Sequence, residues 1–199
     1  MNRLENWLCS STFWRRITRE KLLPWLLSGT DLGDHVLEIG AGAGAATEEL
    51  RSRARRVTSL EYSRHLVTKL AARNHRQNGS PASDCEVLQG DASALPFPGK
   101  TFSAVIAVLM LHHLKSPEAQ DAAFAEVFRV LRPAGVFVAL DIPDGWLHRI
   151  AHIRSTFVPL APSAAPGRLA AAGFSNVSID FQRGFFRLWA SRGGAPIIP

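Results

Sequence analysis

Residues Val36–Gly44 read VLEIGAGAG, an apolar run that leads directly into a glycine-rich turn. The apolar run predicts a buried β-strand, and every second residue of the turn is a glycine: Gly40, Gly42 and Gly44. Glycine has no Cβ, so a ligand can come close to the backbone there. A helical pattern starts at Ala45, which would place the first amides of a helix beside the turn. A strand, a glycine turn and a helix in this order predict a site for a nucleotide-type ligand.

On both sides of this stretch, strand-like and helix-like segments alternate, the pattern of a doubly wound α/β fold. Helices are expected at 45–54, 63–73, 117–131 and 146–157, with a Pro/Ala-rich connection after the last one. The Gln182-Arg183-Gly184 tripeptide predicts a hairpin between the last two strands. We therefore expect a mostly parallel seven-stranded sheet with an antiparallel C-terminal hairpin, its strands at 35–39, 56–60, 85–89, 102–109, 135–140, 175–181 and 185–191.

Composition limits the class of protein. A chain of 199 residues with 46% apolar content is enough for one domain with a proper core. No run reaches the length of a membrane span, and Arg3 and Glu5 interrupt any secretory h-region. Cys9 and Cys85 are far apart and show no metal spacing, so we expect reduced thiols in a cytoplasmic protein.

The net charge of +6 suits an anionic substrate, a membrane surface or nucleic acid. Outside the N-terminal segment, no stripe of basic residues is interleaved with stacking aromatics, so nucleic acid is not an expected partner.

The first thirty residues form a predicted helical cap, ahead of a main domain at 31–192 and a flexible tail at 193–199. Two apolar stripes lie at helical spacing, Leu4/Trp7/Leu8 and Phe13/Trp14/Ile17, and Pro24 interrupts the second helix. The opposite side is basic, with Arg15, Arg16, Arg19 and Lys21. Such a segment can cover a ligand pocket, contact an anionic membrane peripherally, or pack on the sheet without touching a ligand.

The glycine turn alone does not identify the ligand. Gly40-x-Gly42-x-x-Ala45, with Glu61 about twenty residues further on, fits the fingerprint of an NAD-dependent oxidoreductase. Three features point elsewhere: an acidic residue inside the first strand, and two short motifs that each follow a later strand, namely Glu38, Gly90-Asp91-Ala92 and Leu111-His112-His113-Leu114.

Taken together, these motifs resemble the class I S-adenosylmethionine-dependent methyltransferases, in particular the small-molecule group that includes the ubiquinone and menaquinone enzymes. The resemblance continues through Leu131–Val138 and Ala172-Gly173-Phe174 and covers about residues 34–191. It implies a Rossmann-like methyltransferase fold, S-adenosylmethionine as the cofactor and a small-molecule methyl acceptor. Ser103 and Ala134 depart from the family pattern, which has an acidic residue and a glycine there. No quinone-type acceptor segment is recognisable, so no quinone is assigned.

The resemblance also implies the cofactor-binding residues. Backbone at Gly40, Ala41, Gly42 and Gly44 would approach the methionine part and the ribose, and Glu38 and the Ala107 backbone would orient the ammonium group. Glu61 would accept both ribose hydroxyls. The adenine would contact Tyr62, Asp91 and the amide of Ala92. Other roles stay open: Glu61 as a helix-start acid, Asp91 as a turn residue and Tyr62 as an ordinary aromatic.

His112, His113 and Asp141 are the candidate catalytic residues. A histidine titrates near neutral pH and could remove a proton from the acceptor, and Asp141 follows the fifth strand on the expected acceptor side. The Leu-His-His pattern can equally serve structure. His148 and His152 are four residues apart on one predicted helix, but no third ligand is evident, so no metal site is expected.

Two further interpretations remain open besides the NAD-dependent oxidoreductase. The chain could be a phospholipid N-methyltransferase at a membrane surface, or it could hold the cofactor without catalysis. The region after the fifth strand is short, which favours a small or exposed acceptor, or a site completed by the second subunit of a homodimer.

Overall fold

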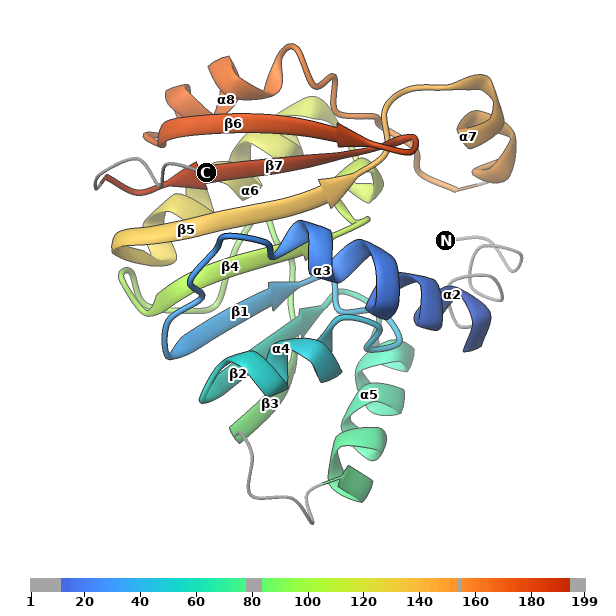
Figure 1. The fold of residues 1–199 in the computed structure, drawn as a ribbon, viewed down its shortest axis with the longest axis vertical. Helices are drawn as coiled ribbons and strands as arrows, with labels where there is room; N and C mark the ends of the chain where they lie inside the picture. Colours follow the sequence, from blue (N-terminus) through green and yellow to red (C-terminus); the bar gives the residue numbers. More distant parts are fainter. Residues whose placement is uncertain (1–11, 78–83, 154, 194–199) are drawn as a thin grey trace.

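Three apolar strands form the centre of the sheet: β1 (His35–Ile39), β4 (Phe102–Val108) and β5 (Leu131–Asp141). The computed structural model describes residues 12–77, 84–153 and 155–193. The other strands are β2 (Arg56–Glu61), β3 (Asp84–Gln89), β6 (Ser175–Gln182) and β7 (Phe185–Ser191). They lie in the order β3-β2-β1-β4-β5-β7-β6 (Figure 1). Strands β1 to β5 are parallel and β7 is antiparallel to both β5 and β6, which confirms the predicted fold class.

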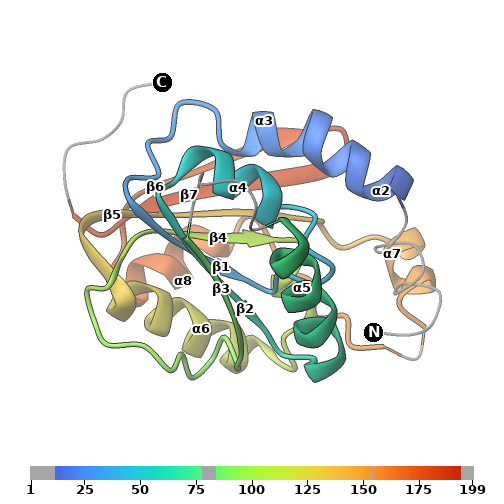
Figure 2. The same ribbon diagram turned by 90° about the horizontal axis from the view of Figure 1, so that it is seen from below.

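Alternating side chains of the central strands give the sheet two apolar faces. Figure 2 shows helices α3 and α4 over one face and α6 and α8 over the other. On the first face Val36 and Ile106 pack with Leu23 and Leu50 of the covering helices. On the second face the sheet packs against helices through a larger cluster that includes Phe102, Phe124, Phe137, Leu169 and Phe174. The sheet is thus a buried layer between two layers of helices.

The helices have the following bounds: α2 (Thr12–Ile17), the π-helix η1 (Thr18–Leu22), α3 (Leu23–Leu26), α4 (Thr47–Arg53), α5 (Arg64–Gln77), the 3₁₀ turn η2 (Leu111–His113), α6 (Pro117–Val130), α7 (Trp146–Ala151) and α8 (Ala165–Ala171). Ser116 caps the start of helix α6: its hydroxyl accepts a hydrogen bond from the amide of Ala119, and Pro117 is the first residue of the helix. No helix in the described part of the chain is long and apolar enough to cross a membrane.

Several predicted boundaries are wrong. Helix α4 begins at Thr47 instead of Ala45, because the glycine turn extends through Ala46. Helix α7 ends at Ala151, six residues before the predicted end. The Pro/Ala-rich connection contains helix α8, which tolerates Pro166 because a first-turn residue needs no N–H partner. Strand β5 begins at Leu131, and a register shift in its pairing with β4 separates this first part from the predicted strand.

The hairpin between β6 and β7 follows its sequence signal. Arg183 and Gly184 have φ angles of 49° and 84°, which suits the twist of a two-residue hairpin.

The N-terminal segment forms one helical run from Thr12 to Leu26 and is not broken at Pro24. The π-helix η1 precedes Pro24, which lies in the first turn of α3, where its missing N–H is tolerated. Leu23 and Leu26 are fully buried. Arg187 of β7 donates to the carbonyls of Trp25 and Ser28 and so joins this segment to the last strand. The predicted Leu4/Trp7/Leu8 stripe, Cys9 and residues 194–199 lie outside the described residues.

Ser103 stands where the family pattern has an acidic residue, and it nevertheless forms hydrogen bonds to neighbouring backbone. Its hydroxyl accepts from the amide of His35 and lies 2.7 Å from the carbonyl oxygen of Leu32. A serine therefore joins β4 to the start of β1 without an acidic side chain. Ala134 has a φ angle of 62°, a conformation that favours the glycine of the family pattern.

Candidate functional site

A cavity of about 480 Å³ opens at the carboxyl ends of β1, β2 and β4. In open parallel sheets, this edge is where ligands bind. Of the predicted cofactor-binding residues, the cavity is lined by Glu38, Gly40, Ala41, Gly42, Glu61, Tyr62, Asp91 and Ala92. Gly44 and Ala107 do not line it. The other lining residues include Thr18, His65, Lys115 and Thr156, which the sequence patterns did not single out.

The glycine turn provides close approach, whereas its amides are already used. The amides of Gly40 and Ala41 donate to the carbonyl of Leu60 on β2, and that of Gly42 donates to the Glu61 carboxylate. A Cβ at Gly42 would meet nothing nearer than a carbonyl oxygen at 4.0 Å, so this residue leaves open space at the cavity wall. These three amides are therefore already hydrogen-bonded within the protein.

Gly40 and Gly44 are required for packing. A Cβ at Gly40 would lie 2.6 Å from Cβ of Met110. A Cβ at Gly44 would lie 2.5 Å from a methyl group of Leu70 on α5, which explains why Gly44 does not line the cavity. Both glycines have positive φ angles, which side chains rarely adopt.

Glu61 ends β2 with both carboxylate oxygens engaged. Oε2 accepts from the amide of Gly42 at 2.9 Å, and Oε1 accepts from the amide of Ser63 at 2.8 Å. A carboxylate oxygen has two lone pairs, so each oxygen can accept one further hydrogen bond. The side chain is thus held in a fixed orientation at the cavity wall with acceptor capacity left on both oxygens.

Glu38 is a buried carboxylate on β1. The hydroxyls of Thr47 and Ser59 both donate to its Oε2, at 2.6 and 2.7 Å, and Oε1 accepts from none of the described residues. Burial raises the pKa of Glu38 to about 7, and the nearby Glu61 contributes to the rise, although both hydroxyl hydrogen bonds lower it. Such a carboxylate is suited to pairing with a cationic group, which would favour its ionised form.

Asp91 is a turn residue, which Sequence analysis gave as an alternative to a role in binding. Its Oδ1 accepts from the amide and the hydroxyl of Ser93, at 2.9 and 2.7 Å. The turn fixes the carboxylate, and Asp91 still lines the cavity. Tyr62 is exposed at the wall, and the ammonium of Lys115 lies 5.6 Å from its ring centre. Ala92 is buried beside Asp91.

The end of β4 approaches the cavity beyond Ala107. Ala107 is paired with Ile39 on one side and Ala139 on the other, inside the sheet. The cavity wall is instead formed by Val108, Leu109 and Met110, which follow it. Leu109 has a φ angle of 54°, a strained conformation of the kind that is frequent at binding sites.

Thr18 connects the N-terminal segment to the cavity. It lies in the π-helix η1, is 1% exposed and lines the cavity wall. No described group forms a hydrogen bond with its buried hydroxyl. Short π-helical segments are frequently found at functional sites, and a buried polar atom without a partner is rare. Sequence analysis missed this residue; the four-residue spacing of Thr18, Leu22 and Leu26 could have placed it on the buried face of the helix.

His112 and Asp141 form a buried pair, and neither residue lines the cavity. His112 Nδ1 lies 2.5 Å from Asp141 Oδ1, and the amides of His112 and Ile142 also donate to this carboxylate. Asp141, which was predicted on the acceptor side, is fully buried and is not among the residues that line the cavity. Asp141 is satisfied by these donors and orients the His112 ring.

His113 is the predicted catalytic residue that reaches the cavity wall. Its Nδ1 lies 3.2 Å from the carbonyl oxygen of Thr156. His152, which the sequence paired with His148, lies beside His112 and His113 instead, with ring centres 5.1 and 5.4 Å away. His148 turns away and donates to the carbonyl of Pro143.

Comparison with known proteins assigns the family. A model described as "Methyltransferase domain" matches residues 37–139, which is more than half of the chain. The chain belongs to this methyltransferase family. The predicted resemblance to class I S-adenosylmethionine-dependent methyltransferases is confirmed, and with it S-adenosylmethionine as the cofactor.

Individual relatives of this methyltransferase chain agree. It is 30% identical over 131 residues to a probable S-adenosylmethionine-dependent methyltransferase of Mycolicibacterium smegmatis, covering 66% of this chain and 46% of that protein. It is 36% identical over 111 residues to a fatty-acid O-methyltransferase of the same organism, covering 55% of this chain and 37% of that protein. The chain spans about half the length, or less, of these relatives.

A solved structure of a SAM-dependent methyltransferase from Aquifex aeolicus has a TM-score of 0.75 to this methyltransferase chain. The two are 17% identical, and the match covers 97% of this chain and 100% of that one. At this identity the likeness shows the fold alone. The fold includes the antiparallel β7, which the dinucleotide-binding alternative does not predict.

The residues of the cavity fit S-adenosylmethionine. The unpartnered hydroxyl of Thr18 offers a hydrogen bond, and the open space at Gly42 admits a ligand next to the backbone. The carboxylates of Glu38 and Glu61 can accept from an ammonium group and from ribose hydroxyls. The methyltransferase cavity thus provides the polar groups that an amino acid and a nucleoside require.

Proposed function

We propose that this protein transfers a methyl group from S-adenosylmethionine to a small-molecule acceptor. The observation that carries the proposal is the cavity at the carboxyl edge of a methyltransferase-family sheet, with Glu38, Glu61 and Asp91 on its wall. S-adenosylmethionine, when bound, supplies an electrophilic methyl group on a sulfonium. The protein's contribution is to bind, to orient and to exclude water, which can supply much of the rate acceleration of a displacement reaction.

We assign the cofactor contacts to the residues that line the cavity. Glu38 pairs with the ammonium group through Oε1, and Glu61 accepts from the two ribose hydroxyls. Asp91 accepts from the adenine amino group, which its Oδ2 can do while Oδ1 holds the Ser93 turn. Thr18 donates to the ligand from the N-terminal side.

His113 is the proposed group that meets the acceptor. A carbonyl oxygen can only accept, so the contact with Thr156 requires a proton on Nδ1 of His113 and leaves the lone pair on Nε2 in the neutral ring. Nε2 could then take a proton from an acceptor hydroxyl, amine or carboxylic acid. His112 and Asp141 act as positioning residues, since neither lines the cavity.

A small acceptor with an apolar body is favoured. The fatty-acid O-methyltransferase among the relatives supports a carboxylate as the methylated group. Trp146, Ile150 and Ile153, around α7, expose large apolar side chains. Neither a phospholipid acceptor nor a role without catalysis is favoured by these observations.

Calorimetric titration of the purified protein with S-adenosylmethionine, S-adenosylhomocysteine and NADH tests the cofactor. We expect micromolar binding of the two adenosyl ligands and none of NADH. A panel of fatty acids, phenols and amines then tests the acceptor by release of S-adenosylhomocysteine. Binding of NADH alone would contradict the proposal, and so would cofactor binding without turnover on every class of acceptor.

A further inference from the structure

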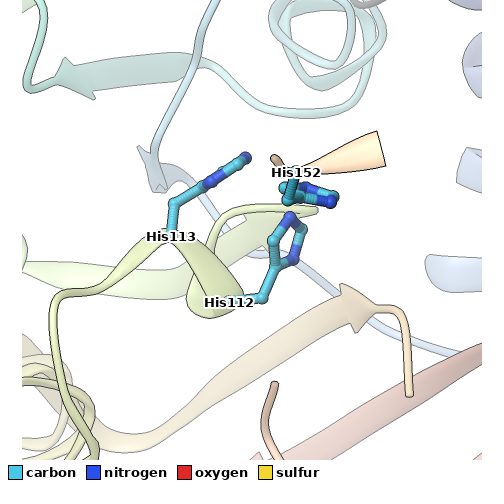
Figure 3. Close-up of side chains that lie close together, drawn as sticks. All are labelled: His112, His113 and His152. Atoms are coloured by element: carbon cyan, nitrogen blue, oxygen red, sulfur yellow. The ribbon is translucent and has the colours of Figure 1, made fainter. Parts of the chain in front are cut away.

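Three histidines from two separate segments gather beside the cofactor cavity. His112 and His113 follow β4 in the turn η2, and His152 follows helix α7. Figure 3 shows the three rings close together, with the ring of His112 pointing toward that of His152. One ring nitrogen from each lies within 4.8 Å of the others, and the ring centres are 4.2 to 5.4 Å apart. This is the convergence that a shared ligand requires.

Each of the three rings has an oxygen acceptor at Nδ1. His112 Nδ1 contacts the Asp141 carboxylate, His113 Nδ1 the carbonyl of Thr156, and His152 Nδ1 the carbonyl of His148, at 2.5, 3.2 and 2.7 Å. Carbonyl and carboxylate oxygens only accept, so Nδ1 carries the proton and Nε2 the lone pair in each neutral ring. Histidines that ligate metals have this second contact, which fixes the tautomer and raises the basicity of the ligating nitrogen.

The rings are also held by packing. Phe157 stacks on His152 with ring centres 4.5 Å apart, and its ring meets His112 at 5.6 Å. His112 is buried, whereas His113 and His152 are half-buried. Zn²⁺ binds imidazole nitrogen at about 2.0–2.1 Å in tetrahedral geometry, which places two ligand nitrogens about 3.4 Å apart. Binding of the ion therefore requires the three nitrogens to close from within 4.8 Å to about this separation.

We propose that His112, His113 and His152 bind a divalent transition metal through Nε2, with Zn²⁺ as the expected ion. Imidazole suits zinc, and three protein ligands with an open position are typical of catalytic rather than structural zinc sites. His113 and Thr156 also line the cofactor cavity, so the metal lies at the cavity wall. The sequence did not show this site, because the third ligand is thirty-nine residues from His113 and not on the same helix.

The use of the metal in the reaction rests on the proposed function, whereas its binding does not. A bound Zn²⁺ can coordinate an oxygen or sulfur of the acceptor and lower the pKa of its proton, which then leaves to solvent. A histidine that ligates the metal cannot at the same time remove this proton. The metal would therefore replace His113 as the means of activating the acceptor.

Zn²⁺ titration of the chelator-treated, full-length chain tests the site by calorimetry, with metal content measured after dialysis. We expect one Zn²⁺ per chain, with affinity reduced at least tenfold in His113→Ala and in His152→Ala. His148→Ala is the matched control. His148 lies in helix α7, which His152 directly follows, and its ring donates to the carbonyl of Pro143 and is not part of the cluster. Circular dichroism and thermal unfolding without metal show that the variants fold.

Retained Zn²⁺ affinity in both His113→Ala and His152→Ala would overturn the proposal, as would the absence of binding to the unmodified chain. An equal loss in His148→Ala would also overturn it, since it would show binding that is not specific to the cluster. S-adenosylmethionine titration of the same metal-free samples reports separately on the proposed function. Failure of zinc binding with intact cofactor binding would reject the metal site alone.

Discussion

At the scale of single residues, the Glu61 carboxylate accepts hydrogen bonds from the backbone of the site and, as proposed, from the ribose of the cofactor. We predict that Glu61→Gln weakens S-adenosylmethionine binding about tenfold to a hundredfold, because an amide group can accept on one atom only and loses its charge. It also loses one of the hydrogen bonds from Gly42 and Ser63. Calorimetry measures the affinity. Glu86→Gln on the exposed side of β3 is the control and should bind like the unmodified chain; equal affinities of all three proteins would contradict the assignment.

Glu38 predicts a dependence of stability on pH. Its folded pKa of about 7 lies above the ordinary value of 4.5, so the folded state holds this proton more tightly than the unfolded state does. Its contribution to stability is therefore fully present below pH 4.5 and is lost as the pH rises to 7. From the size of the shift, the loss is about 3 kcal/mol.

Urea unfolding without ligand at pH 5, 6, 7 and 8 measures this effect in the unmodified chain and in Glu38→Gln. Other carboxylates have lowered pKa values and give the opposite slope, so the difference between the two proteins isolates Glu38. We expect the stability of the unmodified chain relative to the variant to fall with rising pH and to level off above about pH 7. A difference that does not change with pH would contradict the prediction.

Individual residues of the site could be predicted from the sequence when they lie near the end of a strand or directly after it. Glu38, Glu61 and Asp91 stand in or directly after predicted strands, and parallel strands end at one edge of the sheet. Thr18 and Thr156 could not be predicted in this way, because they reach the cavity from segments whose position depends on tertiary packing. The burial of Asp141 was missed for the same reason, since its partner His112 lies in the turn that follows a different strand, β4.

At the scale of elements, the glycines of the turn have different roles: Gly40 is needed for packing, and Gly42 leaves space for the ligand. Gly40→Ala would place a Cβ 2.6 Å from Met110 Cβ at a positive φ angle, so we predict a loss of about 2–4 kcal/mol in stability. Gly42→Ala meets no close atom and should lose about 1–2 kcal/mol through its positive φ angle, while S-adenosylmethionine affinity falls at least tenfold. Thermal unfolding and calorimetry measure the two quantities. Unchanged affinity in Gly42→Ala would show that the ligand does not approach this turn.

The buried hydroxyl of Thr18 in the π-helix η1 should lower the stability of the protein without ligand and strengthen the binding of the cofactor. We predict that Thr18→Val raises the unfolding free energy by about 1 kcal/mol, because the shape is kept and an unsatisfied polar group is removed. The same change should weaken S-adenosylmethionine binding several-fold. Thr68→Val on the exposed side of α5 serves as the control, and its affinity should stay unchanged. A gain in stability with no loss of affinity would mean that Thr18 has no ligand contact.

Element identities were easier to predict than their limits. Helix α6 carries a clear apolar spacing and a serine cap, and its predicted and observed bounds differ by one residue. Helix α8 was missed because its alanines and prolines carry little periodic signal, and its buried residues, Ala165 and Leu169, pack on elements far away in the sequence, including β6 and α6. The π-helix η1 has no sequence rule of its own, and the helical run continues from it into α3, which contains Pro24 in its first turn.

At the scale of the whole molecule, Arg187 joins the last strand to the first helices. Its guanidinium donates to Trp25, Ser28 and Thr30, and burial lowers its pKa. We predict that Arg187→Gln loses about 2 kcal/mol and lowers the melting temperature by about 4–8 °C. Arg56→Gln, in an exposed ion pair with Asp84, should change it by about 1–2 °C at most. Equal melting temperatures for the two variants would contradict the role of Arg187.

The overall topology followed from the alternation of strands and helices, the hairpin signal and the family resemblance. Alternation predicts a parallel sheet, whereas it does not give the order of the strands. The place of β7 between β5 and β6 depends on which strand edges remain available after the helices pack, and no local pattern records that choice.

This position of β7 has a consequence for synthesis on the ribosome. Strands β5 and β6 have no bond to each other, and each is bonded to β7, whose last residue is Ser191. When β6 has left the ribosome, one edge of β5 is therefore still unpaired, and β6 has no hydrogen-bonded neighbour until β7 emerges. The nascent protein would depend on protection from aggregation up to the last steps of translation of this domain.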